Sequence, residues 1–326
     1  MSSPPPAVSV VMPAYNSKAY IERAIESILN QTLADLELVI GDDHSTDGTW
    51  EIINEYATRD PRVKVFRNEE NSGSATTINR AVAMASAQVI AAMDSDDMSV
   101  LYRLERQLKL LHDEPEIVVV GSYVSHINES DEILSLSKTG PASVAEFEDL
   151  SRRGEPTMVF GGTAMFEKRH FEAVGGFDST LRAAADIEFC DRMSELGPVV
   201  AIAEPLVLYR IYGTSNVMLR FREGRMTHRF LEARRAARRA GQRLPTRDEH
   251  VARERLLPWW KRLDIRRDDF AQFYYRKAGL SFAEHHKAGT VLNLILAGTA
   301  RPIYVVGRAW RQRLSPEARR ARTRTA

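Results

Sequence analysis

Three aspartates, Asp94, Asp96 and Asp97, stand directly after the apolar run Val89 to Met93. Carboxylates this close raise one another's pKa and weaken the fold unless a positive charge offsets them. Hard divalent ions such as Mg²⁺ and Mn²⁺ prefer oxygen ligands, and commonly bind one or two carboxylates together with substrate phosphates. The cluster therefore predicts a Mn²⁺ or Mg²⁺ site, with Asp96 and Asp94 as ligands, which share a side of an extended backbone, and Asp97 as a further candidate. A solvated acidic loop that caps the helix after Ser99 is the alternative.

A further carboxylate, Asp186, stands near the start of a predicted helix over 184–196. The positive end of a helix dipole favours a negative charge at this place. From there Asp186 could act as a general base towards a substrate hydroxyl. A helix N-cap carries the same sequence signal, so the residues alone leave both interpretations open.

Two turn segments follow two other apolar runs. The first comes after Val8 to Met12 and consists of Pro13, Ala14, Tyr15 and Asn16. Its small residue and flat aromatic ring could frame a nucleobase, although a plain strand-to-helix turn explains this segment better when it is taken alone. The second is the pair Asp42 and Asp43 after Leu38 to Ile40. A carboxylate here could accept a hydrogen bond from a base N–H, and two adjacent like charges are hard to explain as helix caps.

The elements that must position these residues alternate along the chain. Short apolar runs predict strands at 8–12, 36–40, 63–66 and 89–93, and amphipathic spacing predicts helices at 18–30, 49–57 and 75–85. This alternation predicts an α/β fold with a doubly wound, mostly parallel sheet. Because such sheets bind ligands at the carboxyl ends of their strands, the candidate residues fall where a ligand site is expected.

The pattern changes after residue 97. A helix is expected over 101–112, strands over 117–120 and 161–166, irregular structure over 122–162 and extended chain over 199–211. From about residue 217 the sequence predicts arginine-rich helices. We therefore expect a disordered leader at 1–6, an α/β domain at 7–215, a helical region at 216–314 and a basic, disordered tail at 315–326.

The net charge of +1 hides two oppositely charged parts. Residues 220–326 contain 27 Lys and Arg against 10 Asp and Glu, whereas residues 1–219 contain 18 against 34. The acidic part fits a site for a metal and a polar ligand. Three interpretations stand for the basic helices at 220–314: a solvated surface that closes over a substrate, a patch that binds an anionic membrane surface, and a nucleic-acid surface, which no recognisable motif supports.

Cysteine usage and the amino terminus indicate a cytoplasmic protein. Cys190 is the only cysteine, which excludes an internal disulfide and fits a reducing compartment. Residues 1–6 lack the basic and apolar regions of a signal peptide, and no run of about 18 apolar residues predicts a spanning helix. We expect the protein in the cytoplasm, with a peripheral position on the cytoplasmic face of the membrane as the alternative.

Nine segments in order resemble the nucleotide-diphospho-sugar glycosyltransferases of family 2, whose fold is called GT-A. The resemblance covers roughly residues 7–215, and each segment is weak alone. The matching segments are VSVVMPAYN (8–16), SILNQT (27–32), LELVIGDDHSTDGT (36–49), NSGSATTIN (71–79), VIAAMDSDD (89–97), GGTAMF (161–166), GGFD (175–178), ADIEF (185–189) and LYRIYGTSN (208–216).

The resemblance implies a role for each turn segment. Residues 13–16 match the segment that lines the nucleoside in the family, and Asp43, with Asp42 beside it, matches the carboxylate that reads the base. Gly73 matches the loop near the donor. Together these positions imply binding of a nucleotide-diphosphate sugar.

The acidic residues match the family's reactive groups. Asp94 and Asp96 match the DxD motif that meets the ribose and the metal, and Asp186 matches the acid that acts as the base in inverting transfer. The glutamate that usually precedes this base is Ala185 here, so Glu188 is the fallback for the base.

The resemblance implies a metal-dependent, inverting transferase that moves a sugar, from a UDP-sugar by preference, to a hydroxyl of a sugar or lipid-linked acceptor. Cell-envelope polysaccharide or glycolipid assembly is the implied setting. A sugar nucleotidyltransferase is one alternative, although residues 13–17 are not the Gly-rich, basic loop that it requires. The other is a catalytically silent scaffold that binds a membrane or nucleic acid; the presence of Asp94, Asp96 and Asp186 argues against it.

Overall fold

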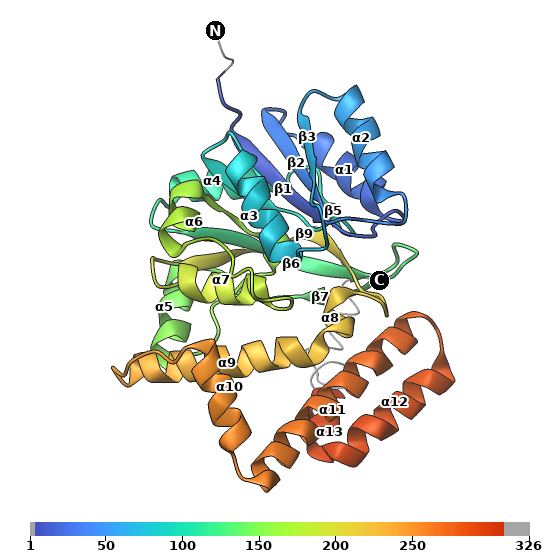
Figure 1. The fold of residues 1–326 in the computed structure, drawn as a ribbon, viewed down its shortest axis with the longest axis vertical. Helices are drawn as coiled ribbons and strands as arrows, with labels where there is room; N and C mark the ends of the chain where they lie inside the picture. The colour runs from blue at the N-terminus through green and yellow to red at the C-terminus, as the bar shows by residue number, and fades with distance from the viewer. Residues whose placement is uncertain (1–3, 310–326) are drawn as a thin grey trace. The chain divides into compact units, whose positions relative to one another are not determined.

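The structure is a computed structural model that describes residues 4–309. It divides into two compact units, Met1–Arg210 and Ile211–Ala326, whereas the sequence prediction places the boundary at residue 215. Figure 1 shows both units, and each is described by itself. Residues 1–3 of the predicted leader and the whole predicted tail at 315–326 lie outside the described residues.

The first unit is built on a mixed sheet with the strand order β3-β2-β1-β4-β8-β6-β9-β5, in which β7 pairs with β6. Its first four strands are parallel: β1 (Val8–Ala14) lies between β2 (Leu36–Asp42) and β4 (Val89–Ala92), and β3 (Val63–Arg67) pairs with β2. The predicted α/β fold is therefore confirmed, and the sequence located these four strands.

Helices cover both faces of this parallel region (Figure 1). Alternate residues of β1 point to opposite faces, so Val8, Val10 and Met12 enter one apolar core and Val11 enters the other. The first core contains α1 (Ile21–Leu29) and α4 (Arg103–Asp113), together with Ile53 of α2 (Thr49–Arg59). The second contains α3 (Ser74–Met84) and α7 (Ala185–Met193). This three-layer arrangement holds the strand ends rigidly.

The remaining strands add a mixed half, in which β6 and β9 pair in parallel and the other pairs are antiparallel. They are β5 (Met98–Ser99), β6 (Val119–Ile127), β7 (Ile133–Ser137), β8 (Met165–Glu167) and β9 (Val199–Arg210), with helices α5 (Val144–Arg153) and α6 (Lys168–Val174) between them. The prediction of irregular structure over 122–162 is wrong, because β7 and α5 lie within it. Capping signals for α5 were present: Ser143 accepts a hydrogen bond from the Glu146 N–H, and Gly154 ends the helix with φ of 70°.

The second unit is helical. Its elements are α8 (Asn216–Leu219), α9 (Phe221–Arg239), α10 (Arg247–Leu256), α11 (Trp259–Ala283), α12 (Lys287–Ala300) and α13 (Pro302–Ala309). Arg229 of α9 pairs with Glu254 of α10 and Asp269 of α11, which ties three helices together. Within residues 4–309, none of the helices combines the length and apolar character needed to cross a membrane.

A buried glutamate fastens the parallel strands at their amino ends. Glu37 of β2 is 4% exposed and accepts hydrogen bonds from the Ser9 hydroxyl and from the Ser86 N–H and hydroxyl, while Lys64 forms an ion pair with it. Burial alone would raise the pKa of Glu37, but the Lys64, Ser9 and Ser86 groups outweigh it and lower the pKa to about 2. The ionised side chain therefore stabilises the folded state.

We expect Glu37→Gln to lower the free energy of unfolding at neutral pH by about 3 kcal/mol, because a group whose folded pKa lies below its unfolded value of 4.5 stabilises the fold above that value. The contribution disappears as the pH falls from 4.5 towards 2, so the difference between variant and parent should shrink over this interval. Chemical denaturation at several pH values measures it. Glu172→Gln, on an exposed glutamate, is the control, and an unchanged difference at low pH would contradict the account.

Candidate active site

The carboxyl ends of the parallel strands bring the predicted turn segments together. Because β1 pairs in parallel with both β2 and β4, the residues after these strands reach one edge of the sheet. The Asn16 N–H donates to the Ser45 hydroxyl at 2.9 Å, and the Thr46 N–H donates to Asn16 Oδ1 at 2.9 Å. The hydroxyls of Ser17 and Ser95 lie 2.7 Å apart. Direct hydrogen bonds therefore join the segments after β1, β2 and β4.

The first segment is partly strand. Pro13 and Ala14 are buried as the last residues of β1, and Tyr15, which is 49% exposed, and Asn16 follow them. Asn16 has a φ of 48°, in the left-handed region that asparagine tolerates better than most residues. This backbone reversal leaves the Tyr15 ring at the surface beside the strand ends.

The two aspartates after β2 have different partners. Asp42 is fully buried and forms an ion pair with Arg67, with 3.0 Å between Oδ2 and Nε. Asp43 accepts hydrogen bonds from the Asn68 amide at 2.8 Å, the Ser72 N–H at 2.8 Å and the Gly73 N–H at 2.7 Å. The structure thus brings Asp43 into contact with Gly73, which precedes α3.

The acidic run after β4 forms a turn at residues 95–96. The prediction of an extended backbone is therefore wrong. Strand geometry does not place the side chains of Asp94 and Asp96 on one side. Asp97 is 1% exposed, and its Oδ1 accepts a hydrogen bond from the Arg210 N–H at 2.7 Å. Asp97 Oδ2 is buried without a hydrogen-bond partner in the described part of the chain.

Asp94 and Asp186 pack against two adjacent glycines. A Cβ on Gly162 would lie 2.6 Å from Asp94 Oδ2, and a Cβ on Gly161 would lie 2.8 Å from Asp186 Oδ2. These distances are shorter than any normal contact, so each carboxylate packs directly against one of two adjacent glycines, and a side chain would not fit at either position. The register explains the first approach: β4 and β8 are antiparallel with Ala91 opposite Met165, so the residues after β4 run beside those before β8.

The carboxylates around these glycines affect one another. Burial first, then the neighbouring charges of Asp96 and Asp186, raises the pKa of Asp94 to about 7. Burial also raises the pKa of Asp186, against the lowering effect of the backbone N–H groups of Ile187 and Gly161. A raised pKa makes a carboxylate a stronger base, and the site therefore contains two such groups against adjacent glycines.

Asp186 and Glu188 differ in what surrounds them. Asp186 is the second residue of α7, after Ala184 with a φ of 58°. Glu188 is 4% exposed and receives two hydrogen bonds from Arg192, at 2.7 and 2.6 Å. Arg192 also donates to the Val174 carbonyl. Glu188 is therefore bound in a buried ion pair, which favours Asp186 over the fallback as the reactive carboxylate.

Sequence reasoning missed two basic residues at this site. Arg103 of α4 is fully buried, donates to the Ala92 carbonyl at 2.7 Å, and its pKa is lowered by burial to about 10. Arg210, at the end of β9, is 2% exposed and donates from Nε to the Asp96 carbonyl at 2.9 Å. Both side chains fix the backbone on either side of the acidic turn. Nothing in the sequence marked these two arginines as buried, because arginine is mostly an exposed residue and is seldom buried without a partner.

Tyr209 also faces the acidic cluster. Burial raises the pKa of its phenol well above the usual value, and the charges of Asp97, Asp96, Asp94 and Asp186 raise it further. The phenol therefore stays protonated at neutral pH and can donate a hydrogen bond. The sequence predicted no separate role for Tyr209, which lies in the matching segment 208–216.

The residues at this edge suit a hard divalent cation only in part. Among the described residues no three His, Cys, Asp or Glu side chains converge as they would around a metal. Mg²⁺ is usually held by one or two carboxylates plus substrate phosphates, however, so two aspartates with a phosphate-bearing ligand would be sufficient. The crowded carboxylates and the unpartnered Asp97 Oδ2 fit such an ion.

Comparison with known proteins identifies the class. A mannosyltransferase of Pyrobaculum calidifontis, PcManGT, solved with GDP-Man and Mn²⁺, superposes with a TM-score of 0.55 at 21% identity over 98% of this chain and 84% of its own. Residues 1–349 of TarS from S. aureus, solved with UDP-GlcNAc, give 0.57 at 17% identity over 92% of each chain. The first unit therefore has the fold of the GT-A glycosyltransferases, as predicted.

The sequence comparisons identify the family. Residues 9–175 match the model of glycosyl transferase family 2. An uncharacterized glycosyltransferase of Methanocaldococcus jannaschii is 31% identical over 224 residues, which are 68% of this chain and 76% of that protein. A chondroitin synthase of Pasteurella multocida is 32% identical over 193 residues, 59% of this chain but only 19% of the synthase, and an Escherichia coli chondroitin synthase is matched over 27% of its length. The chain belongs to glycosyl transferase family 2, a family of transferase enzymes.

We expect Gly162→Ala to reduce turnover by about a hundredfold, because the added methyl group displaces the Asp94 carboxylate. The folded state should persist, since the nearest atoms to the new Cβ belong to the Asp94 side chain. Release of nucleoside diphosphate and the midpoint of thermal unfolding measure the two effects. Gly279→Ala is the control, because no atom lies within 4 Å of its new Cβ. Equal activity in both variants would show that Asp94 need not occupy this position.

Proposed function

We propose that this chain transfers a sugar from a nucleotide-diphosphate sugar, by preference a UDP-sugar, to an acceptor hydroxyl with inversion at the anomeric carbon. The observation that carries the proposal is the packing of Asp94 and Asp186 against the adjacent glycines 161 and 162, close enough for their charges to interact, in a chain of family 2. We also propose that residues 7–215 form the catalytic domain and residues 216–314 a separate helical region.

The donor would bind at the carboxyl ends of β1 and β2. In this proposal Pro13, Ala14, Tyr15 and Asn16 line the nucleoside, and Asp43, with the buried Asp42 beside it, faces the base. Asp43 uses three of its acceptor positions on protein donors, and an ionised carboxylate has about four, so one remains for a base N–H. Gly73, held by Asp43, lies at the donor loop. TarS and PcManGT, which share the fold, were solved with nucleotide sugars.

A Mn²⁺ or Mg²⁺ ion would be held by Asp96 and Asp94 together with the diphosphate. Asp97 is the weaker candidate, because its Oδ1 already accepts from the Arg210 N–H and the side chain is almost fully buried. When bound, the ion supplies positive charge that offsets the charge building on the departing diphosphate. Arg103 and Arg210 hold the turn that carries these aspartates.

Asp186 would remove the proton of the acceptor hydroxyl. As the acceptor oxygen forms a bond to the anomeric carbon, the bond from that carbon to the diphosphate oxygen breaks, and the proton passes to the Asp186 carboxylate. The backbone N–H groups that face this carboxylate orient it, and burial raises its pKa, which makes it a stronger base. Inversion follows from this single displacement.

The names of several relatives suggest the setting. Two relatives are chondroitin synthases, and a Bacillus subtilis relative, 42% identical over 106 residues, is the putative teichuronic acid glycosyltransferase TuaG. We propose cell-envelope polysaccharide or glycolipid assembly, with a sugar or lipid-linked acceptor. The enzyme would act at the cytoplasmic face of the membrane, with an anionic membrane surface as partner of the helices at 220–314.

We expect Asp186→Asn to lower the rate of sugar transfer by a factor on the order of a hundred to ten thousand while nucleotide-sugar binding persists. Glu188→Gln should instead lower the unfolding midpoint and leave most of the transfer rate, because it weakens a buried ion pair with Arg192. Nucleoside diphosphate release and thermal shift with UDP-, GDP- and dTDP-sugars, with and without Mn²⁺, measure both. The reverse pattern would make Glu188 the base.

The same assays separate the alternative functions. Release of pyrophosphate in place of nucleoside diphosphate would identify a nucleotidyltransferase. Absence of a Mn²⁺-dependent thermal shift with every nucleotide sugar, in a chain that is folded by calorimetry, would favour a catalytically silent scaffold. Either result would overturn the proposed transfer reaction.

A further inference from the structure

The helix α12 carries its large apolar side chains on the outside. Val291, Leu292 and Ile295 are each 57% exposed, and at 100° per residue they lie within one arc of about 100° on the helix surface. The buried side of the same helix consists of Asn293, Ala297 and Ala300. A helix in a water-soluble bundle normally has the opposite arrangement, with the aliphatic side chains inside.

Small and polar side chains form the interface between α11 and α12, which lie side by side (Figure 1). Ala278 and Ala283 of α11 are buried, and the Asn293 amide donates to the Ser281 hydroxyl at 3.2 Å. Gly289 lies against Ser281, since a Cβ there would be 3.1 Å from the hydroxyl oxygen. Close packing through small residues with one side-chain hydrogen bond is typical of helix pairs that lie in lipid.

Exposed apolar side chains continue beyond α12. Ile303 and Val306 of α13 are 88% and 69% exposed, and α13 follows α12 after the single residue Arg301. At the start of α11, Trp259 and Trp260 are 67% and 57% exposed. Tryptophan is enriched where one end of the ring is in lipid and the other in water.

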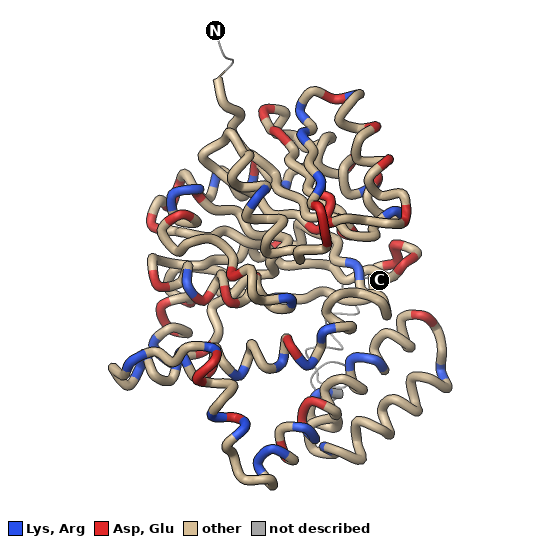
Figure 2. The backbone as a smooth tube through the Cα atoms, in the orientation of Figure 1, with Lys and Arg blue, Asp and Glu red and all other residues tan. Residues whose placement is uncertain are grey.

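The charge of this region favours an anionic partner. Residues 285–326 contain nine Lys and Arg and one acidic residue, Glu317. Figure 2 shows α12 as an uncharged stretch between basic positions, with Lys287 at its first residue and Arg301 after its last. An aliphatic surface combined with a basic cluster gives the two signals that hold a protein on an anionic bilayer.

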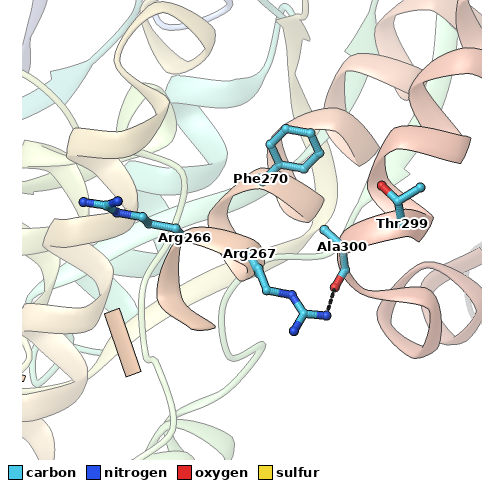
Figure 3. A pocket seen from close by; sticks show the side chains of 5 residues that line it. All are labelled: Arg266, Arg267, Phe270, Thr299 and Ala300. Carbon is cyan, nitrogen blue, oxygen red and sulfur yellow. Dashed lines mark hydrogen bonds between the residues drawn. The ribbon is translucent and has the colours of Figure 1, made fainter. Parts of the chain in front are cut away.

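A shallow depression beside these elements is also basic. It has a volume of about 350 Å³ and is lined by Arg266, Arg267, Phe270, Thr299 and Ala300 (Figure 3). Arg267 donates to the Ala300 carbonyl at 3.0 Å, which satisfies one of the last carbonyls of α12. Arg266 points away from that carbonyl in Figure 3 and is exposed. Its guanidinium suits a lipid phosphate at the headgroup level.

We propose that α12 and α13 insert Val291, Leu292, Ile295, Ile303 and Val306 into the headgroup–acyl boundary of an anionic bilayer. The flanking Lys287, Arg301 and Arg308 then bind the lipid headgroups. A helix of 14 residues is about 21 Å long, which is shorter than a hydrocarbon core of roughly 30 Å, so α12 lies in the interface and does not span it. This inference makes the proposed membrane partnership specific and does not depend on the transfer reaction.

Vesicle binding tests the proposal with the full chain. We expect sedimentation with phosphatidylcholine vesicles that contain phosphatidylglycerol, and much weaker sedimentation with phosphatidylcholine alone or at high salt. Leu292→Ser with Ile295→Ser should lower the partition coefficient by about tenfold or more, because two aliphatic side chains no longer enter the lipid. Leu219→Ser with Leu256→Ser is the matched control, since those leucines are 73% and 85% exposed on other helices. The control should sediment like the parent chain.

Further measurements keep the outcomes distinct. Both double variants should keep the parent's unfolding midpoint, because every replaced side chain is at least 57% exposed. Equal binding of parent and Leu292/Ile295 variant, or no binding of the parent to anionic vesicles, overturns the proposal. Light scattering tests whether the surface binds a second copy instead. If the parent and the control form a concentration-dependent dimer and the Leu292/Ile295 variant does not, the surface is a dimer interface and the proposal is wrong. Donor-dependent thermal shift is measured in parallel, so loss of vesicle binding is not mistaken for loss of the transferase site.

Discussion

The repulsion among Asp94, Asp96 and Asp186 is the interaction on which the candidate site depends. Burial and this repulsion raise the pKa of Asp94 to about 7. The charge of the nearby Arg103 lowers the pKa of Asp94, but burial and the neighbouring carboxylates outweigh it. The fold therefore keeps an excess of negative charge at the end of β4. Such a site gains free energy when a cation or a proton enters it, which is what a metal-assisted transferase with a carboxylate base requires.

The strand order makes this costly arrangement stable. β1 is flanked by parallel partners on both sides, so the segments that follow three strands meet without strain in the sheet. The antiparallel β8 then brings Gly162 against Asp94, and α7 presents Asp186 against the neighbouring Gly161. At the opposite ends of the same strands, the Glu37 network joins β1, β2 and the residues before β4. Fixed strand ends keep the carboxylates close although they repel.

The sequence predicted the parallel half of the fold because each element there has its own apolar period and a turn signal at its end. It also placed Asp43 and Gly73, Asp94, and Asp186 in segments that the structure brings to one edge. It missed β7 and α5, whose residues are largely exposed, and it misjudged the backbone of the acidic turn, which depends on Arg210 from a distant strand. The bond between Glu188 and Arg192 and the approach of Gly162 to Asp94 are tertiary contacts, and a single sequence carries no periodic signal for them.

The net charge of +1 is the sum of an acidic part and a basic part, which suit the two partners proposed for this chain, a dication and an anionic surface. A uniformly acidic protein would attract the metal and be repelled by anionic lipid, and a uniformly basic one would do the reverse. Here the acidic residues lie mostly before residue 220 and the basic residues after it. In the second unit, aliphatic side chains face outward from α12 where charge is absent, and arginines adjoin them. Charge attraction fades with salt, and insertion of a few aliphatic side chains is weak alone, so the proposed attachment needs both. In the proposed function, this combination would hold the chain on a membrane surface, while the acidic unit would bind the metal and the diphosphate.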